Sequence, residues 1–543
     1  MGDCKLKICK ISPFVRGDFV YENIAYAYRG DLFSASFIIE NVSADNLSVK
    51  IEPSSLRSPE ASVSSDFISI RIVEKARGHI GRGYDRGLMP DFPKIEIDEI
   101  IDYKSSGDVR AHSSLRFFYY VNFPQNASPG LYKGKLKICY GDSFFELDLR
   151  IRLFDLCREE SPFDINLWQY PFSSYRFYEL SEKDLFRKRH LDILREHLFL
   201  YKDLSGKTLT TTIVDEPRNH QTFDDSPSMV RKILKDGRIE FDYSYFDSFL
   251  GLGESLDMLD KIYAFSLISW GADKNDKGFW QMFLPDFIDH LDELEYFDKT
   301  YIGIDEREES DVRDAIDFLS DFKNKEGKTF KIAYQTSFDK ENIELFDRID
   351  DVSFILSSVD YDCLSYVRDR RKKGLFTSLY TCTGIFPNTF LYSEPFEATW
   401  LILFSYLNGF DGFLRWALDA WVKDPRQDTS FFLWESRDSF LIYPSTDKRE
   451  NSPSPSLSFE GMRIGLMMVE KIAFIRKTLK GYYLEQFEKE IPRLRPKTSF
   501  ENEYGARVSS KDELVKTLEE VEIISKLIYK YSRIIEEGCY ENY

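Results

Sequence analysis

The stretch Thr300-Tyr-Ile-Gly-Ile-Asp305-Glu306-Arg307 is an apolar run that ends in two neighbouring acids. Ser310 follows it as a suitable N-cap for a helix over 311–323, and another apolar run begins at Phe330. A buried strand, a helix and a second buried strand in this order are typical of a βα unit. In a barrel built from such units, the residues at the carboxyl end of each strand face the side on which the chemistry takes place.

The same alternation of short apolar runs and amphipathic segments extends over the middle of the chain. One helix is expected over 182–201, and strands are expected to begin at Ile165, Thr208, Tyr263, Thr300, Phe330, Val352, Phe376 and Phe410. Eight strands are enough to close a barrel. A doubly wound open sheet is the alternative, but no GxGxxG motif follows the first strand. The sequence therefore predicts a (β/α)8 barrel of the TIM type over residues 158–480.

The two ends of the chain follow other patterns. Residues 1–157 contain alternating runs such as Phe33-Ser-Ala-Ser-Phe-Ile-Ile, separated by turn signals such as Pro129-Gly130. Several strands of this kind predict a β-sandwich. Residues 481–543 are expected to form a helical extension, because one apolar stripe runs through Leu514, Leu518, Val521, Ile524 and Ile528.

The charge of the chain limits its partners. There are 92 acidic and 73 basic residues, which gives a formal net charge of −19. Such a surface repels phosphate, so we expect no nucleic-acid partner, and binding to anionic membranes is disfavoured. The sequence contains no run of about 18 apolar residues, so no membrane span is expected. The first residues, Met1-Gly-Asp-Cys-Lys-Leu-Lys, lack the apolar segment of a signal peptide, so a cytoplasmic location is expected.

Motifs for metal, phosphate or nucleophilic chemistry are missing from the sequence. The seven Cys include no CxxC pair, which favours reduced thiols, and the six His form no ligand-spaced cluster with Cys. Neither a GxSxG elbow nor a GxxxxGK loop occurs. We therefore expect no metal and no cofactor.

Asp305 and Glu306 are the candidate catalytic residues. Two nearby carboxyl groups can divide the work of catalysis when one stays protonated and the other ionised, and cleavage of a glycosidic bond needs both states. A second pair, Asp215-Glu216, also ends an expected strand. Periodicity alone does not separate the two pairs, and a solvated surface loop is the alternative for either.

Aromatic and amide residues near the strand ends are candidates for sugar contact. All seven Trp lie between residues 168 and 434, and aromatic faces bind the apolar faces of sugar rings. Trp400 is expected in the middle of a helix and therefore in the core. The candidates for substrate binding are Trp168, Trp270, Gln335, Tyr380, Asn388, Trp416 and Trp421. For Gln335 and Asn388, a satisfied loop amide is an equally good interpretation.

Several segments resemble the catalytic domain of glycoside hydrolase family 123 and its uncharacterised relatives. They include Thr210-Thr-Thr-Ile-Val-Asp-Glu-Pro217, Tyr301-Ile-Gly-Ile-Asp-Glu-Arg307, Ser393-Glu-Pro-Phe-Glu-Ala398 and Gly409-Phe-Asp-Gly-Phe-Leu-Arg-Trp416. The resemblance covers about residues 160–480 and, more loosely, the N-terminal region. The order of the segments is more specific than any one of them.

The resemblance implies a sandwich followed by a (β/α)8 barrel, and retaining β-N-acetylgalactosaminidase activity by substrate-assisted catalysis. Carried over to this chain, Asp305 stabilises the acetamido group of the substrate and Glu306 is the general acid and then the base. Asp215-Glu216 matches an earlier stretch that is not the catalytic pair. Arg307 stands where many catalytic members have Pro, and a guanidinium there favours ionised carboxylates, which supports Asp305 and opposes a protonated Glu306.

The sequence thus predicts an exo-acting β-N-acetylhexosaminidase, whose partner is a glycan or glycoconjugate with a terminal N-acetylhexosamine. Three alternatives stay open: a glycosidase of another specificity, a non-catalytic glycan-binding barrel, and metal-assisted hydrolysis. A binding protein would hold glycans without turnover, whereas a metal-dependent enzyme would be inhibited by chelators.

Overall fold

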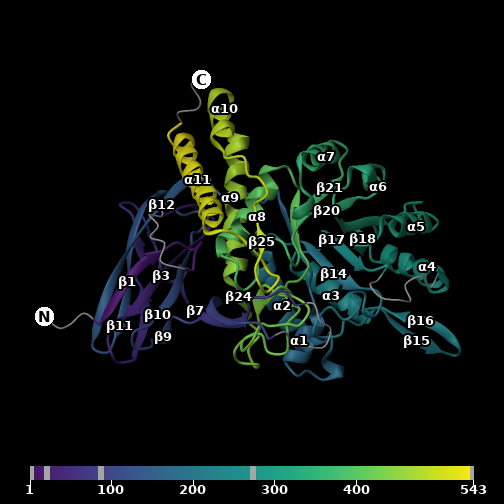
Figure 1. Ribbon diagram of the computed structural model, residues 1–543, viewed down its shortest axis with the longest axis horizontal. Coiled ribbons are helices and arrows are strands. Elements are labelled where there is room, and N and C mark those ends of the chain that lie inside the picture. The colour runs from purple at the N-terminus through teal and green to yellow at the C-terminus, as the bar shows by residue number, and fades with distance from the viewer. Residues whose placement is uncertain (1–4, 17–24, 84–90, 269–276, 539–543) are drawn as a thin grey trace.

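The computed structural model describes residues 5–16, 25–83, 91–268 and 277–538 (Figure 1). The chain consists of an N-terminal β-rich region, a parallel barrel and a group of helices. In Figure 1 the N-terminal sheets and the barrel lie on opposite sides, with α8, α9 and α11 between them.

Two sheets form the N-terminal region. The first has the order β1 (Leu6–Ile11), β3 (Leu32–Asn41), β10 (Ser114–Asn122), β7 (Ile68–His79), β8 (Lys94–Asp102). The second has the order β2 (Tyr26–Arg29), β12 (Ser143–Cys157), β11 (Gly130–Tyr140), β4 (Leu47–Pro53), β9 (Ser106–Val109), with β5 (Leu56–Arg57) and β6 (Ser62–Val63) beside β11. Buried side chains of both sheets, among them Phe37 and Ile151, belong to one hydrophobic cluster. The expected β-rich region is confirmed.

Eight parallel strands form a nearly closed barrel. Their order is β14 (Thr208–Thr212), β17 (Lys261–Phe265), β18 (Thr300–Asp305), β19 (Lys331–Thr336), β20 (Asp351–Ile355), β21 (Phe376–Tyr380), β22 (Gly412–Arg415), β13 (Asp164–Leu167). The first strand along the chain, β13, therefore pairs with the last, β22. A doubly wound sheet would instead reverse its order near the middle. The order is that of a TIM-like barrel, as predicted.

Helices connect most of these strands. They are α1 (Pro171–Phe177), α2 (Lys188–Lys202), α3 (Ser244–Ser255), α4 (Lys277–Glu293), α5 (Glu309–Leu319), α6 (Ile343–Phe346), α7 (Tyr361–Lys372) and α8 (Pro395–Leu407). The prediction that Ser310 caps the helix after β18 is wrong. The N-cap of α5 is Glu308, so Ser310 lies inside the first turn. The helix begins earlier because the chain turns directly after the strand.

The barrel has a seam, because β13 and β14 do not pair although both are fully described. Side chains bind the backbone groups at this seam. The Gln169 amide donates to the Thr208 carbonyl (3.3 Å), and its oxygen accepts from the Thr210 N–H (2.8 Å). The Tyr201 hydroxyl donates to the Ile165 carbonyl (3.0 Å). Buried backbone groups need such partners, so these two side chains complete the barrel.

Replacement of Gln169 by Leu should destabilise the protein, because it leaves the buried Thr210 N–H without its partner. We expect the free energy of unfolding to fall by about 1–3 kcal/mol. Urea denaturation followed by fluorescence measures this as a lower midpoint. Gln427→Leu is the matched control, since Gln427 is exposed and should tolerate the change. Equal midpoints for the two variants would contradict this account of the seam.

The C-terminal helices are α9 (Leu457–Thr478), α10 (Gly481–Glu490) and α11 (Lys511–Glu536). The predicted apolar stripe of α11 is confirmed, because Leu518, Val521, Ile524 and Ile528 are buried and Leu514 packs against the same core. Trp400 is fully buried, as expected, and donates to Glu520 of α11 (2.7 Å). None of the described helices is long and apolar enough to cross a membrane.

Candidate active site

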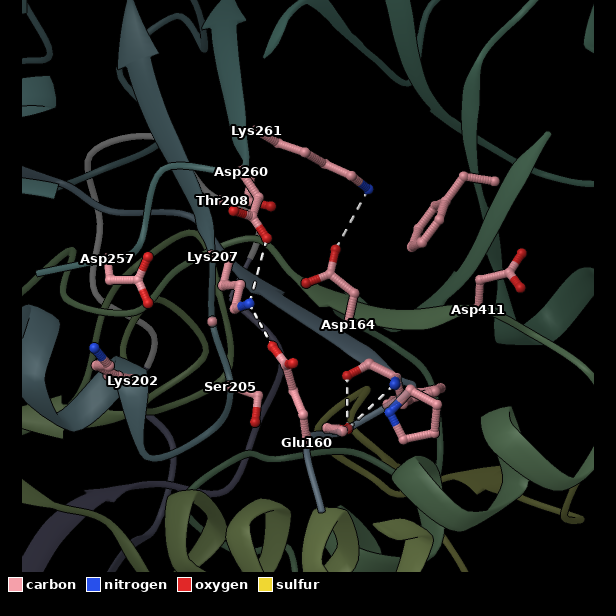
Figure 2. A pocket seen from close by; sticks show the side chains of 15 residues that line it. Glu160, Asp164, Lys202, Ser205, Lys207, Thr208, Asp257, Asp260, Lys261 and Asp411 are labelled. Carbon is pink, nitrogen blue, oxygen red and sulfur yellow. Dashed lines mark hydrogen bonds and ion pairs between the residues drawn. The ribbon is translucent and has the colours of Figure 1, made fainter. Parts of the chain in front are cut away.

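A wide cavity of about 610 Å³ lies at the amino ends of the barrel strands. Asp164 and Lys261, the first residues of β13 and β17, are among its lining residues. Several of its charged groups pair with one another, as Figure 2 shows: Lys207 lies 2.6 Å from Glu160, and Lys261 lies 3.4 Å from Asp164. No Trp is found among its described lining residues. This end of a barrel normally serves stability rather than catalysis.

A smaller cavity of about 180 Å³ lies at the opposite, carboxyl end of the strands. Most of the predicted site residues meet there. Its lining consists of Trp168, Gln221, Asp305, Glu306, Gln335, Tyr380, Cys382, Thr383, Leu414, Trp416, Trp434 and Asp438. Barrel enzymes place their active sites at this end, where loops from several strands converge.

The acid pair reaches this cavity through a sharp turn of the backbone. Asp305 is the last residue of β18, and Glu306 adopts a positive φ of 47°. The Glu306 N–H donates to the Gln335 carbonyl at 2.9 Å, which fixes the turn against β19. Consecutive side chains of a strand point to opposite faces. Because the chain turns at Glu306, both carboxyl groups line the same cavity, at the cost of local backbone strain.

The environment of Glu306 favours its protonated form. Burial of the carboxyl raises its pKa above the ordinary value of 4.5, and this is the largest effect. The Tyr380 hydroxyl donates to Glu306 Oε1 at 2.7 Å and lowers the pKa by a smaller amount. The pKa is raised although Arg307 is the next residue; the Arg307 guanidinium lies 3.8 Å from Asp311 on α5. A carboxyl group with a raised pKa can act as a general acid.

Three indole rings surround the acid pair. Trp416 donates to Asp438 Oδ2 (2.9 Å), and Trp434 donates to the Gln221 carbonyl (2.9 Å). The two rings meet edge to face with centroids 6.1 Å apart. Trp168 lies deeper and is almost fully buried. Because each of the two outer rings is fixed by a hydrogen bond, they form a rigid apolar wall of the kind that suits a sugar ring.

Gln335 offers polar groups for a ligand. It lies beside Asp305 in the β18–β19 register and is only 1% exposed. Neither its amide nitrogen nor its side-chain oxygen has a hydrogen-bond partner among the described residues, and the same holds for the indole nitrogen of Trp168. Buried polar groups without partners are costly. The site therefore contains donors and an acceptor that a polar ligand can satisfy.

A model of the catalytic domain of glycoside hydrolase 123 matches residues 168–278 and 271–475, which is more than half of the chain. The chain belongs to glycoside hydrolase family 123. It is therefore a glycosidase, and the predicted resemblance is confirmed.

Solved structures include one that resembles this family 123 enzyme over its whole length. It is a family 123 glycoside hydrolase from Clostridium perfringens, described in connection with glycolipid glycan hydrolysis. It is 26% identical, with a TM-score of 0.91, and the match covers 99% of this chain and 100% of that one. An endo-β-1,4-mannanase from Thermotoga petrophila matches far more weakly (12% identity, TM-score 0.33, covering 57% of this chain and 77% of that one) and carries no argument. No curated protein sequence matches the chain.

The prediction that Trp421 contacts the substrate is wrong. Trp421 is fully buried, its indole nitrogen donates to the Ile442 carbonyl (2.8 Å), and its ring packs against His197 (5.1 Å between centroids). It follows the end of β22, but its ring belongs to a hydrophobic cluster with Phe431 and Leu433, in the segment that carries Trp434. Trp421 thus belongs to the core of this enzyme.

Asn388 also lies outside the cavity, so its predicted role in binding is wrong. Its amide donates to the carbonyls of Cys382 (2.8 Å) and Ile385 (3.0 Å), and its oxygen accepts from the Thr389 N–H (2.9 Å). The alternative interpretation from the sequence, a loop amide whose hydrogen bonds are satisfied within the protein, is therefore the correct one for Asn388. Its hydrogen bonds fix the turn that brings Cys382 to the cavity. Trp270, the remaining candidate, lies outside the described residues.

The second acid pair lies away from the site. Asp215 accepts a hydrogen bond from the Ser228 N–H (2.8 Å), and Glu216 lies 3.3 Å from His220. Glu216, His220 and Asp225 form a cluster that the sequence spacing did not suggest, although its groups lie close enough together to hold a metal ion. His220 and Asp225 are exposed, and nothing further indicates a metal there. Among the described residues of the connection between β14 and β15, Gln221 is the one that lines the cavity.

Six lining residues were not among the predicted site residues. Cys382 and Thr383 follow β21 and Leu414 belongs to β22, and the other three are Gln221, Trp434 and Asp438. These three lie in long connections that follow β14 and β22 and have no periodic pattern. The signals for Trp434 were its place within the Trp-rich half of the chain and its place among the segments that resemble family 123. Nothing local marked Asp438, whose carboxylate pairs with the buried Arg415 and accepts from Trp416.

Proposed function

We propose that this family 123 enzyme is an exo-acting β-N-acetylhexosaminidase, of the β-N-acetylgalactosaminidase type, that uses the acetamido group of its own substrate as the nucleophile. The main support is one arrangement: Asp305 and Glu306 line the same Trp-walled cavity, and burial raises the pKa of Glu306. The small volume of the cavity suits a single terminal sugar residue. Similarity to the Clostridium perfringens enzyme, which is described in connection with glycolipid glycan hydrolysis, further favours a glycolipid glycan as substrate.

In the first step of the proposed reaction, Glu306 gives its proton to the glycosidic oxygen while the acetamido oxygen attacks C1. The bond between C1 and the leaving oxygen breaks, and a cyclic oxazolinium ion forms. Asp305, which lines the same cavity, is proposed to stabilise the positive charge that develops on the acetamido group. In the second step Glu306 takes a proton from water, which attacks C1 from the face of the departed alcohol. The bond between C1 and the acetamido oxygen breaks and the acetamido group is restored, so the configuration is retained. Gln335 and Asp438 are proposed to bind hydroxyl groups or the acetamide.

Hydrolysis of aryl glycosides tests the proposal. The aryl β-N-acetylgalactosaminide and glucosaminide should be hydrolysed with retention, whereas the aryl β-galactoside, which has a hydroxyl in place of the acetamido group, should not. Equal turnover of the galactoside would contradict participation of the acetamido group. The alternative, a glycosidase of another specificity, would then be favoured.

Tyr380→Phe should shift the pH dependence of kcat/KM. The tyrosine hydroxyl stabilises the charged form of Glu306, so its removal raises the pKa of Glu306 further. Activity requires the protonated acid and is lost as the pH rises through this pKa. The alkaline limb of the profile should therefore move to higher pH in the variant. A limb that stays in place, or moves to lower pH, would rule out Glu306 as the group that titrates there.

We also propose three domains: a β-sandwich over 1–157, the catalytic barrel over 158–480 and a helical extension over 481–543. The hydrophobic cluster shared by the two N-terminal sheets supports the first. The end of α9 at Thr478 supports the second boundary.

A further inference from the structure

The connection after β14 extends into a hairpin of two strands, β15 (Arg231–Lys235) and β16 (Arg238–Asp242), that projects from the body of the molecule (Figure 1). Asp236 and Gly237 form its turn with φ values of 50° and 76°. Asp-Gly is a preferred pair for a tight hairpin turn. All residues of β15 and most of β16 are exposed. The hairpin is therefore a well-formed element that adds little to the core.

Next to the charged turn Lys235–Arg238, the outer end of the hairpin, here called its tip, carries exposed apolar side chains. Leu234 is 75% exposed and pairs across the strands with Ile239, which is 44% exposed. Their side chains share one face of the hairpin, and Ile233, on the other face, is 43% exposed. Only the base of the hairpin is anchored, because Phe241 packs on Phe283 of α4 (5.0 Å between centroids). An exposed apolar group on a projecting element indicates an interaction site.

Basic side chains flank this apolar tip, in a chain whose net charge is −19. Arg231 pairs with Asp242, and Lys235 lies 3.4 Å from Glu240. Arg238 forms no ion pair with any described residue, and the ammonium group of Lys232 lies over the Phe279 ring at 3.9 Å. Arg238, beside the tip, is thus a positive charge without an ion pair among the described residues, whereas Lys232 lies opposite Phe241 at the base of the hairpin. Apolar side chains flanked by cations suit the interface of a phospholipid layer, where phosphate groups lie above the hydrocarbon.

The hairpin and the active site lie at the same end of the barrel. The connection begins at the carboxyl end of β14, where the Met229 N–H donates to the Thr212 carbonyl (2.8 Å). Gln221, earlier in the same connection, lines the cavity of the acid pair. A surface that binds the tip therefore lies on the side of the molecule to which the cavity opens.

We propose that this hairpin docks the enzyme on the surface of a phospholipid bilayer, with Leu234 and Ile239 between the headgroups and Arg238 facing lipid phosphates. The inference rests on the proposed function in one respect, that the substrate is a glycolipid glycan. The acidic remainder of the chain is repelled by phosphate, so the contact is confined to the hairpin. A second copy is a poorer occupant, because two hairpins that meet bring like charges together.

Vesicle binding tests the proposal directly. The full chain is sedimented with vesicles of phosphatidylcholine and a minor share of phosphatidylglycerol, beside the double variant Leu234→Asp/Ile239→Asp. We expect the double variant to bind at least about tenfold more weakly. Ile523→Asp is the matched control, because Ile523 is a 45% exposed apolar residue of α11, far from the hairpin in the sequence, and it should bind as the unmodified protein does. Failure of the unmodified protein to bind, or equal binding by the double variant, overturns the proposal.

Two further measurements separate the docking from the chemistry. Arg238→Glu should weaken vesicle binding and reduce its dependence on salt. The double variant should hydrolyse a soluble aryl glycoside normally but act more slowly on a glycolipid in the vesicles. If the unmodified protein hydrolyses neither substrate, the proposed function fails, but the vesicle-binding experiment still tests the docking proposal.

Light scattering tests whether a second copy binds the hairpin instead. If the unmodified protein is a dimer, the double variant is a monomer and neither binds vesicles, the hairpin is a dimer contact and the proposal is overturned.

Discussion

Glu306→Gln should lower kcat/KM on an aryl β-N-acetylgalactosaminide by about 10²–10⁴-fold, the usual contribution of a general acid and base. The amide keeps the shape of the side chain and can still accept from Tyr380, but it has no proton to transfer to the glycosidic oxygen. The loss should be greater for an alkyl leaving group than for an aryl one, because a poorer leaving group needs the proton more. Steady-state kinetics on the two kinds of substrate measure both effects.

Glu216→Gln is the matched control for this variant. Glu216 also follows an Asp shortly after the end of a strand, β14, and also has a positive φ, of 46°, but it lies outside the cavity. We expect this change to leave kcat/KM nearly unaltered. If both variants keep full activity, Glu306 is not the acid, and the chemistry lies elsewhere in the barrel.

Asp305→Asn should lower kcat by about 10²–10³-fold, as expected when one group that stabilises a transition state is removed. The carboxylate is proposed to balance the positive charge that grows on the acetamido nitrogen during ring closure. A neutral amide does not balance that charge. The effect should appear mainly in kcat, since the charge is absent from the bound substrate.

Asp215→Asn serves as the control for Asp305→Asn, because Asp215 accepts a backbone hydrogen bond away from the cavity. A second readout separates charge stabilisation from general damage. An N-acetylgalactosamine thiazoline, which imitates the cyclic intermediate, should inhibit the Asp305→Asn variant much less than the unmodified enzyme. Equal inhibition of the two would show that Asp305 does not act on the acetamido group.

The barrel and the acid pair could be predicted from the sequence because both leave a local signal. Buried parallel strands are short apolar runs, and the end of such a run marks the face on which Asp305 and Glu306 lie. The seam left no such signal. It depends on Gln169 reaching across to β14, and no spacing in the sequence reveals a contact between two strands that do not pair.

The errors at the site have a common physical cause. Closeness to a strand end predicts that a residue is near the rim of the barrel, but not the direction of its side chain. Trp421 turns into the core and Asn388 closes a turn, whereas Trp434 and Asp438 reach the cavity from a loop without periodicity. Loop conformation depends on distant contacts such as the pair between Asp438 and Arg415. The Asp-Gly turn of the hairpin was visible in the sequence, but its exposure was not.

A crystal structure with the N-acetylgalactosamine thiazoline tests the central claim most directly. We expect the sugar ring to lie between Trp168 and Trp416, with the thiazoline nitrogen within hydrogen-bond distance of Asp305 and with Glu306 near the anomeric carbon. A thiazoline bound with its fused ring turned away from Asp305, or bound instead at the amino ends of the strands beside Asp164 and Lys261, would contradict the proposed mechanism.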